Sequence, residues 1–523
     1  MNRDDMLRRL AERPDGWDVL VIGGGATGVG VAVDAASRGY DVALLEQSDF
    51  GKGTSSRSTK LIHGGVRYLQ QGNIPLVMEA LKERGILRNN APHLVRDLPF
   101  VVPNYKWWEA PFYGIGMRVY DALAGKYGFG KSRNLSREET VRRIPTIETD
   151  GLLGGVMYHD AQFDDARLLI DLAMTAAEQG AVLVNYARVD GLLKGSDGFV
   201  DGVVVVDEES GDGMELRGRV VVNATGVFTD AVRRMDDPDA ASIIQPSQGV
   251  HVVLDRAFLP GDSAIMVPHT DDGRVLFAIP WFDRVVVGTT DTPVDAPSLE
   301  PVPLAEEVDF ILEHARRYLE RDPERSDVLS VFAGLRPLVA ADDASGGTGD
   351  TSQVSREHVI RVSGSGLLTI AGGKWTTYRK MAEDTVDAAA ALGDLPPEEC
   401  VTRELAIHGF HRHSDRFGEL APYGSDAPAV KGLMAAEPDG GTALHPRLGL
   451  RRGEVMWAAR REMARTVDDV LARRSRALLL DARAATEAAP AVARILAREL
   501  GRDGAWERAQ VEAFEAVAAG YVV

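Results

Sequence analysis

A glycine-rich segment at residues 17–28 constrains the fold of this chain more than any other feature. The apolar run Val19 to Ile22 is typical of a buried parallel strand, and it leads directly into Gly23-x-Gly25-x-x-Gly28. In this pattern the first glycine allows a tight turn, the second lets the backbone approach a pyrophosphate, and the third lets the following helix pack closely on the strand. The segment therefore predicts a dinucleotide-binding fold.

The residues after this segment complete the pattern. Residues 29–38 are mostly small and predict a helix, Gly39 ends it, and residues 41–45 are predicted as a second strand. Glu46 ends that strand at the distance from Gly28 where an acid that binds ribose belongs. A glycine-rich turn alone would be weak evidence, but the two strands, the helix and the acid together favour a dinucleotide site.

The length and composition of the chain narrow its class. Its 523 residues are too many for one core and predict two or three domains. The net charge of −19, with no run rich in Lys or Arg, argues against a nucleic-acid partner, because an acidic surface repels phosphate backbones. The single cysteine, Cys400, excludes an internal disulfide and any cysteine-based iron–sulfur or zinc site within the chain. We find no signal peptide or long apolar run and expect an intracellular protein, at most peripheral to a membrane.

The order of the predicted elements assigns the chain to the α/β class, α+β overall. Strands at 202–206 and 216–222 flank an acidic turn, and the second leads to Ala-Thr-Gly226. A helical pattern covers 75–99, and the chain beyond residue 396 is helical. An antiparallel sheet is predicted from short strands at 250–254, 264–267, 274–280 and 284–289. We therefore predict a doubly wound Rossmann-like domain (1–75, 155–235 and 330–395), an antiparallel substrate or cap domain (76–154 and 236–329) and a C-terminal helical domain (396–523).

Residues 104–133 form a locally basic segment in an acidic protein. Only Glu109 and Asp121 oppose its cations, which are interleaved with aromatic residues: Lys106, Arg118, Lys126, Lys131 and Arg133. Faces that bind the membrane interface have this composition. A domain interface or the wall of a channel has it too, and both readings stay open.

Six motifs, in this order and spacing, carry a resemblance to a known family. They are GGGATG at 23–28, SSRSTKLIHGGVRYLQ at 55–70, SQGVHVV at 247–253, VVGTTDTP at 286–293, GLRPL at 334–338 and AGGKWTTYRKMAED at 371–384. The ordered set resembles the FAD-dependent glycerol-3-phosphate dehydrogenases. The similarity covers about residues 16–485, and the run at 463–481 looks like the C-terminal helical domain of that family.

The resemblance implies a cofactor, a reaction and a location. The cofactor would be non-covalently bound FAD. The reaction would be oxidation of sn-glycerol 3-phosphate to dihydroxyacetone phosphate by hydride transfer to the flavin, with the electrons passed to a membrane quinone. The protein would be cytoplasmic and peripheral on the inner face of the cell membrane. The anaerobic form of the family carries cysteines in a C-terminal extension, whereas this chain has only Cys400; it looks like the self-contained, homo-oligomeric respiratory form, such as a dimer.

Matching the family's motifs assigns a cation-rich substrate pocket to Arg67, Tyr68, Arg336, Arg356 and Lys374. A phosphate dianion needs such groups, and Arg356 and Lys374 are the first choice for it. An ordinary surface salt bridge is the alternative for Arg336 and Arg356. His251 is the candidate general base, because imidazole is matched to proton transfer near neutral pH; its alternative is a core histidine in an apolar strand. His251 and Arg336 are the expected catalytic residues.

The same match assigns the cofactor site. The residues expected to hold FAD are Gly23, Gly25, Gly28, Glu46, Ser55, Ser56, Lys60, His63, Gly65, Gly226, Gly372 and Gly373. We expect no metal site, because His408, His411 and His413 are loosely spaced and lack a pattern of acidic partners.

Two other functions compete with this reading. A flavin-dependent amine or 2-hydroxy-acid oxidase would need a clamp for a carboxylate but not the cluster of Arg67, Arg336, Arg356 and Lys374. A non-catalytic flavin-bound scaffold or redox sensor would need no base such as His251. The excess of cations favours a phosphorylated substrate over the first, and the presence of His251 argues against the second.

Overall fold

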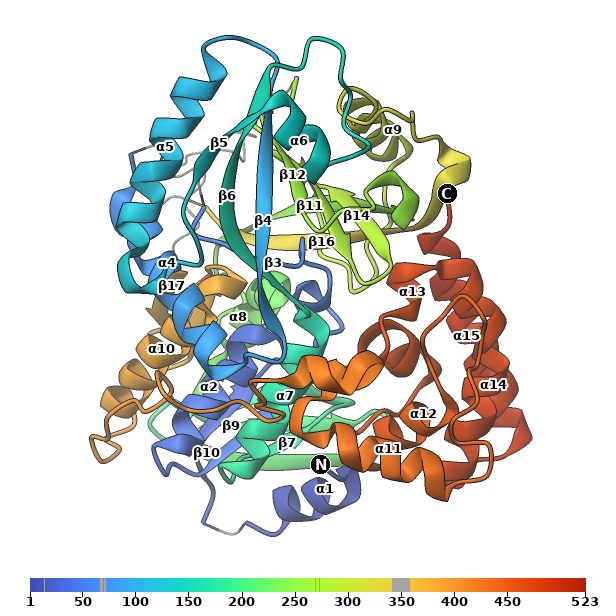
Figure 1. Ribbon diagram of the computed structural model, residues 1–523. Helices are drawn as coiled ribbons and strands as arrows, with labels where there is room; N and C mark the ends of the chain where they lie inside the picture. Colours follow the sequence, from blue (N-terminus) through green and yellow to red (C-terminus); the bar gives the residue numbers. More distant parts are fainter. Residues whose placement is uncertain (14, 66–68, 70–71, 269, 272, 341–357) are drawn as a thin grey trace.

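Two β-sheets and a group of C-terminal helices make up the computed structural model (Figure 1). The structure describes residues 1–523 apart from 14, 66–68, 70–71, 269, 272 and 341–357. In Figure 1 the second sheet lies above the first, and the C-terminal helices lie to the right of both.

The first sheet is built around strand β1 (Trp17–Ile22), which carries the glycine-rich turn. β1 pairs in parallel with β10 (Gly213–Asn223) on one side and with β2 (Val42–Leu45) on the other. The full order is β17 (His358–Val362), β18 (Leu368–Gly372), β10, β1, β2 and β7 (Val182–Val184). β9 (Val200–Asp207) and β8 (Ala187–Lys194) extend from β10 as an antiparallel excursion. The predicted doubly wound core and the predicted hairpin are thereby confirmed.

Helix α2 (Ala26–Ser37) lies in the centre of the layer that covers this sheet. It packs against α7 (Asp165–Glu178) and α10 (Tyr378–Leu392), and its small residues let the helices approach closely. A Cβ added to Gly30 would lie 3.0 Å from the ring of Tyr378. Two further helices, α1 (Arg3–Ala11) and α8 (Thr229–Asp236), pack near the edge strands.

The second sheet is largely antiparallel and confirms the predicted sheet at 250–289. Its order is β15-β11-β14-β13-β12-β4-β6-β3, with β16 beside β11 and β5 beside β6. The strands are β3 (Leu61–Ile62), β4 (Val95–Asn104), β5 (Arg133–Ser136), β6 (Gly154–Phe163), β11 (Ile244–Asp255), β12 (Ala264–Val267), β13 (Leu276–Trp281), β14 (Arg284–Gly288), β15 (Thr292–Pro293) and β16 (Val328–Val339).

The helical prediction over 75–99 is right at its start and wrong at its end. Helix α4 (Ile74–Asn90) begins at the side-chain cap of Asn73, and β4 begins at Val95. β4 pairs with β6 along its whole length. Because this partner lies far along the chain, the local pattern of residues 95–99 carries no sign of the pairing.

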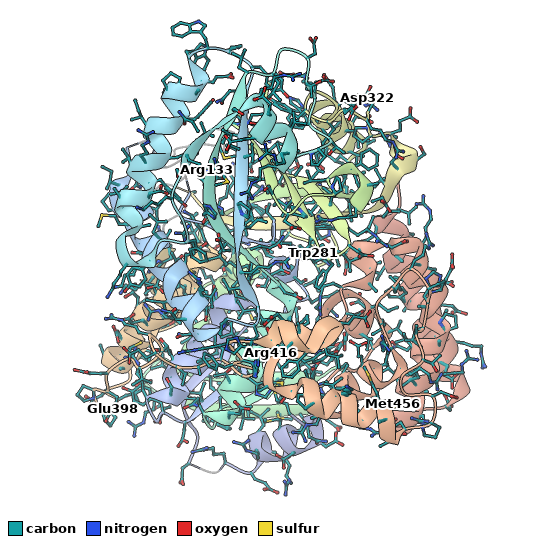
Figure 2. The ribbon with its side chains drawn as sticks, viewed as in Figure 1. Arg133, Trp281, Asp322, Glu398, Arg416 and Met456 are labelled. Atoms are coloured by element: carbon teal, nitrogen blue, oxygen red, sulfur yellow. The ribbon has the colours of Figure 1, made fainter. Side chains whose placement is uncertain are left out.

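Helices flank the second sheet and form the C-terminal part. Beside the sheet lie α5 (Glu109–Ala124), α6 (Arg137–Arg143) and α9 (Ala305–Arg316). The C-terminal helices are α11 (Ala427–Ala436), α12 (Arg452–Arg461), the π-helical turn η9 (Asp469–Arg474), α13 (Ala477–Leu480), α14 (Ala482–Leu500) and α15 (Gly504–Ala518). Trp281 of β13 joins their hydrophobic cluster and lies between the sheet and these helices (Figure 2).

Short 3₁₀ turns connect these elements. They are η1 (Thr54–Ser56), η2 (Gly125–Tyr127), η3 (Gly226–Phe228), η4 (Arg256–Phe258), η5 (Arg325–Asp327), η7 (Trp375–Thr377), η8 (Ser414–Asp426) and η10 (Ala519–Tyr521).

The chain passes between the two sheets more often than the predicted domain ranges suggest. β3, β6 and β16 pair within the second sheet, although 1–75, 155–235 and 330–395 were assigned to the first domain. The chain therefore crosses between the sheets directly beside residues of the predicted site, and the domain boundaries stay a prediction.

A buried ion-pair network ties the C-terminal helices to the loop after β2. Asp49 is fully buried and accepts two hydrogen bonds from Arg474, at 2.6 and 2.9 Å, and one from Arg473 at 2.5 Å. Burial alone would raise the pKa of Asp49, but Arg474 and Arg473 hold it below its usual value. The carboxylate thus stays ionised and fixes the loop that follows it.

Removal of one arginine from this network is expected to be strongly destabilising. Arg474→Met leaves buried charge without its bidentate partner, and we expect the free energy of unfolding to fall by about 3–5 kcal/mol. Denaturant unfolding followed by circular dichroism measures it. The control is Arg217→Met, because Arg217 is half-exposed and pairs with the equally exposed Asp201; its loss should cost about 0–1 kcal/mol. Equal losses in the two variants would contradict the structural role of the network.

Candidate active site

We describe two cavities, and the larger of them lies where β1 and β18 end. It encloses about 460 Å³ and is lined by the glycine-rich turn, the loop at 51–59, β8, η3, α8 and the turn after β18. Open α/β sheets bind ligands at the carboxyl ends of their strands. The position and the lining therefore suit an extended dinucleotide.

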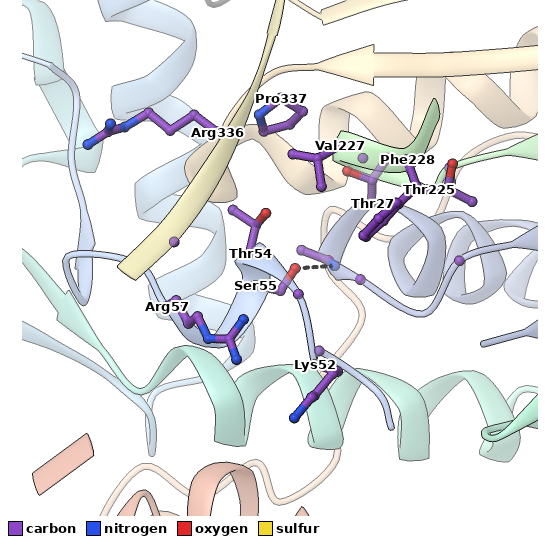
Figure 3. Close-up of a pocket in the computed structure, with 18 of the residues that line it drawn as sticks. Thr27, Lys52, Thr54, Ser55, Arg57, Thr225, Val227, Phe228, Arg336 and Pro337 are labelled. Carbon is purple, nitrogen blue, oxygen red and sulfur yellow. Dashed lines mark hydrogen bonds between the residues drawn. The ribbon is translucent and has the colours of Figure 1, made fainter. Parts of the chain in front are cut away.

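The glycine-rich turn forms the floor of this cavity. Gly23 has a φ of 110°, and a Cβ on Gly28 would lie 1.9 Å from the carbonyl oxygen of Gly23. Any larger residue at Gly28 would therefore displace the start of α2. The amide of Ala26, in the first turn of α2, donates to Ser55 Oγ at 2.9 Å, and Figure 3 shows Ser55 reaching towards this end of the helix. Backbone amides and the positive helix end thus face the cavity, as a pyrophosphate requires.

Glu46 lies at the side of the cavity where the sequence places a ribose. Its carboxylate accepts hydrogen bonds from the amides of Gly24 at 2.6 Å and Ser48 at 2.9 Å. Burial raises the pKa of Glu46 to about 7, although these two bonds act in the opposite direction. The group therefore changes its charge near neutral pH.

The far end of the cavity is an apolar slot between two elements. Val189 of β8 lines it on one side, and Ala231, Val232 and Met235 of α8 line it on the other. A flat aromatic base fits between such walls. Adenine is therefore the natural occupant of this end of a dinucleotide site.

A second cavity, of about 160 Å³, adjoins the first. Both cavities are lined by Thr59, Leu61, His63 and Arg336, so they meet at these residues. The other walls of the smaller cavity come from the second sheet and include Asp160, Arg274 and Asp291. A small polar molecule in this cavity would lie directly against the end of a dinucleotide in the first.

His251 of β11 lines the larger cavity close to this junction. Its Nε2 lies 2.9 Å from Thr59 Oγ1, and its ring stacks on Phe332 with the centroids 4.9 Å apart. Burial and the nearby charges of Arg336 and Lys60 lower the pKa of His251 well below 6.5. The imidazole is therefore neutral at physiological pH, as a base must be before it accepts a proton.

Arg336 of β16 lies at the junction of the cavities. Its guanidinium donates to Asp291 Oδ1 at 3.1 Å, to the carbonyl of Thr290 at 3.0 Å and to Thr289 Oγ1 at 3.2 Å. A Cβ on Gly249 would lie 2.4 Å from the guanidinium, so glycine is needed there. These contacts hold a cation in a fixed position at the mouth of the smaller cavity, which is not the surface salt bridge considered from the sequence.

The turn after β18 supplies a second cation and a pair of unusual glycines. Gly372 and Gly373 have φ values of 78° and 75°, which L-residues with side chains rarely adopt. They turn the chain so that Lys374 lines the larger cavity at the start of η7. The glycine pair predicted to precede a helix is therefore present, with its lysine in the wall.

The structure divides the predicted residues into three groups. The larger cavity is lined by His251, Arg336, Lys374, Gly23, Gly25, Glu46, Ser55, His63, Gly226, Gly372 and Gly373, and the smaller by Gly65. Gly28, Ser56 and Lys60 lie behind the walls: Ser56 donates to the carbonyl of Gly51, and Lys60 pairs with Asp165 at 2.8 Å. Arg67, Tyr68 and Arg356 lie outside the described residues.

The lining residues that the sequence did not single out include Arg57, Thr59 and Arg274. Arg57 and Thr59 belong to the motif at 55–70, whose run of serines, threonine and basic residues gave no way to rank its members. Arg274 precedes a short strand of the second sheet and reaches the smaller cavity only through long-range pairing. The described residues contain no group of three or more His, Cys, Asp or Glu that could hold a metal ion.

Comparison with known proteins gives consistent matches. A family model described as FAD dependent oxidoreductase matches residues 18–379, and one described as the C-terminal domain of alpha-glycerophosphate oxidase matches residues 368–509. The mitochondrial glycerol-3-phosphate dehydrogenase of Macaca fascicularis is 42% identical over 530 residues, which covers 95% of this chain and 72% of that protein. The Homo sapiens protein is 41% identical with the same coverage.

A solved structure extends the match to three dimensions. The X-ray structure of the glycerol-3-phosphate dehydrogenase from Bacillus halodurans, complexed with FAD, aligns with a TM-score of 0.81 at 30% identity. The alignment covers 100% of this chain and 98% of that one.

The pKa of Glu46 predicts how dinucleotide binding depends on pH. A ribose hydroxyl donates to the ionised carboxylate, so protonation of Glu46 below about pH 7 removes an acceptor. We expect the affinity of the apoprotein for FAD, the ligand of the Bacillus halodurans structure, to fall by up to about tenfold per pH unit below that value. Quenching of flavin fluorescence measures the dissociation constant.

Glu46→Gln is the matched control for this titration. The Gln side chain has no proton to gain in this pH range. The variant should therefore bind FAD more weakly than the wild type at pH 8, and its dissociation constant should stay nearly constant down to pH 5.5. A pH dependence equal to that of the wild type would assign the effect to another group.

Proposed function

The chain belongs to the FAD-dependent glycerol-3-phosphate dehydrogenases, and we propose that it oxidises sn-glycerol 3-phosphate to dihydroxyacetone phosphate and passes the electrons to a membrane quinone. The observation that carries the proposal is the junction of the two cavities at Thr59, His63 and Arg336. A cofactor-sized cavity opens there into a smaller one with a fixed cation at its mouth. A small anionic substrate held in the smaller cavity would lie against the reactive end of the cofactor.

The residues of the larger cavity fit FAD. The steric limit at Gly28, the amide of Ala26 and the carboxylate of Glu46 suit the pyrophosphate and the ribose, and the slot beside Met235 suits adenine. The other end, near His63 and the glycine pair, is then left for the isoalloxazine. Bound FAD supplies the hydride acceptor, while the chain binds and orients the substrate and moves the proton.

The substrate phosphate would be held by cations at the edge of both cavities. Lys374 and Arg336 line the walls, and Arg274 adds a cation to the smaller cavity. Arg67, Tyr68 and Arg356 are assigned to the same pocket by the family match alone. Fixed arginine forks and a lysine point charge are suited to a phosphate dianion.

The general base would be His251. It is neutral, buried and hydrogen-bonded to Thr59 at the junction of the cavities. Removal of the proton from the C2 hydroxyl raises the electron density on oxygen and favours departure of hydride from C2. Arg336 would stabilise the negative charge that develops on this oxygen.

Helix α5 and the residues before it supply a candidate membrane-binding face. Trp108, Phe112, Ile115 and Val119 form one exposed stripe with helical spacing, and Trp107 is 82% exposed. Tyr113, Met117 and Tyr120 on the opposite side are buried against the second sheet. The segment predicted as either a membrane face or an internal interface thus has an inner face and an unpartnered outer face within this chain.

The charges around this face support the membrane alternative. Lys106, Arg118, Lys126, Lys131 and Arg133 are exposed. Glu109 and Asp121 accept bonds from nearby backbone amides of Lys106 and Ser132. An apolar stripe bordered by cations suits the interface of an anionic leaflet. No helix among the residues described is long and apolar enough to cross a bilayer. We place the protein on the inner face of the cell membrane; a dimer stays a prediction.

Anaerobic addition of sn-glycerol 3-phosphate to the purified holoprotein tests the reaction and the phosphate site together. We expect the flavin band of the wild type to bleach. Lys374→Ala should retain FAD but need about 10–100 times more substrate for half-maximal reduction, because a charge-assisted hydrogen bond to phosphate is lost. The measurements are flavin absorbance and the substrate dependence of its loss.

Lys380→Ala is the control, since Lys380 lies nearby in the first turn of α10 but pairs with Asp384 outside the cavities. An unchanged substrate dependence in Lys374→Ala would remove that residue from the phosphate site. A flavin band that persists in the wild type would contradict the reaction itself and return the substrate to amines and 2-hydroxy acids.

Charge reversal tests the membrane face. Lys126→Glu/Lys131→Glu should release the protein from liposomes that contain anionic lipid, since each basic residue near such a surface contributes about 1 kcal/mol. Sedimentation with liposomes measures the bound fraction. Lys431→Glu, on α11 of the C-terminal part, is the control for net charge and should stay bound. Retention of the double variant would favour the alternative that 104–133 is an internal or subunit interface.

A further inference from the structure

Thr59 lies where the two cavities meet and lines both of them. Its Oγ1 is 2.9 Å from Nε2 of His251. Nδ1 of the same ring is buried and has no hydrogen-bond partner among the described residues. Thr59 is therefore the one described residue that fixes the polar edge of this imidazole, and its hydroxyl lies between the ring and the space for a substrate.

A buried carboxylate binds the residues on both sides of Thr59. Asp165, fully buried at the start of α7, accepts from the amide of Ser58 at 3.0 Å and from its hydroxyl at 2.7 Å. It also accepts from Lys60 Nζ at 2.8 Å with each carboxylate oxygen, and Lys60 donates in addition to the carbonyl of Ser56 at 2.7 Å. Asp165 therefore holds the residue before Thr59 and the residue after it.

Lys60 also lies close to the aromatic ring on which His251 stacks. Lys60 Nζ lies 5.2 Å from the centroid of Phe332, and Phe332 stacks on His251. Lys60 also adopts a left-handed backbone conformation, with a φ of 64°, which costs free energy in a residue with a side chain. This strained, buried lysine lies directly after Thr59 and over the ring of Phe332, and these are the two neighbours of the imidazole.

We propose that the Thr59 hydroxyl relays the substrate proton to His251 and that Asp165 and Lys60 are positioning residues for this relay. The inference rests on the proposed function. The proton of the C2 hydroxyl moves to Thr59 Oγ1 as the proton of Thr59 moves to His251 Nε2. The hydride of C2 passes to bound FAD, and C2 and its oxygen become a carbonyl. Thr59 ends unchanged, the histidine ends as imidazolium, and two electrons leave the substrate.

The relay sets a condition on the tautomer of His251. Nε2 can accept a proton from Thr59 only through its lone pair, so the neutral ring must carry its proton on Nδ1. The opposite tautomer would donate from Nε2 to Thr59 and could not act as the terminal acceptor through this hydroxyl. The Nδ1–H tautomer is thus required by the relay, whereas a histidine that only packs in the core could have either tautomer.

Removal of the hydroxyl tests the relay kinetically. Thr59→Val keeps the shape of the side chain, and we expect anaerobic reduction of the holoprotein by saturating sn-glycerol 3-phosphate to slow about 100-fold, with unchanged flavin content. Thr59→Ser keeps a hydroxyl and should stay within about fivefold of the wild type. Thr385→Val removes a buried hydroxyl that bonds only within α10 and should have no effect. Reduction of Thr59→Val within about twofold of the wild type would overturn the relay.

NMR of the holoprotein labelled with ¹⁵N-histidine tests the tautomer without turnover. The signals of His251 are assigned by their loss in His251→Gln. We expect the Nδ1–H form at pH 7.5 and a shift of the Nε2 signal in Thr59→Val but not in Thr59→Ser. The Nε2–H form in the wild type would overturn the proposal.

A double-mutant cycle tests the positioning role. Asp165→Asn alone should slow reduction about tenfold while FAD stays bound. In the Thr59→Val background, Asp165→Asn should slow reduction little further, because both substitutions disable the same proton path. A double variant whose rate falls by the product of the two single effects would overturn the positioning role. Failure of the wild type to bleach would overturn the proposed function and the relay with it, whereas bleaching at the same rate in the wild type and in Thr59→Val would overturn the relay alone.

Discussion

The close approach of Gly28 to the carbonyl of Gly23 is the constraint from which the site follows. Because a Cβ on Gly28 would lie only 1.9 Å from the carbonyl oxygen of Gly23, the start of α2 packs directly onto the end of β1, and the first residues of α2 line the larger cavity. The turn also sets the position of Ser55, which accepts from Ala26. The loop from 51 to 60 is thereby fixed against the helix, and Thr59 with it.

Buried ion pairs hold the other side of this loop. Asp49 is bound by Arg473 and Arg474 of the C-terminal helices, and Lys60 is bound by Asp165 of α7. Such pairs contribute little net stability, because the cost of removing charges from water offsets their attraction. They do, however, permit only one arrangement, since a shifted loop would leave a buried charge unpaired. The geometry of the cavity walls is therefore specified by electrostatics at both ends of the loop.

The sequence predicts best those features that depend on neighbouring residues. The turn at Gly23 to Gly28, the acid at Glu46 and the glycine pair at Gly372 and Gly373 are local, and they lie in the structure where the pattern placed them. Strand β4 was missed because its partner β6 lies far along the chain. Lys60 was assigned to the cofactor by the match to the family's motifs. Its pairing with Asp165 depends on how the loop lies against α7, which no local pattern encodes.

Helix α5 shows why the composition of 104–133 could not be interpreted from sequence alone. Its residues Phe112 and Ile115 are exposed. Tyr120 is buried, accepts from the amide of Gly64 at 2.8 Å and donates to Asp160 at 2.8 Å. Burial, and then the charge of Asp160, raise the pKa of Tyr120 well above its usual value, so the phenol keeps the proton that it donates. Asp160 lines the smaller cavity, and Gly64 lies between His63 and Gly65. Aromatic residues of one helix thus serve two environments: the outer ones suit a lipid interface, and the inner one fixes the backbone beside the proposed substrate pocket. Membrane face and internal interface were posed as alternatives for this segment; the helix has one side buried against the second sheet, and the membrane contact of its outer side stays a proposal.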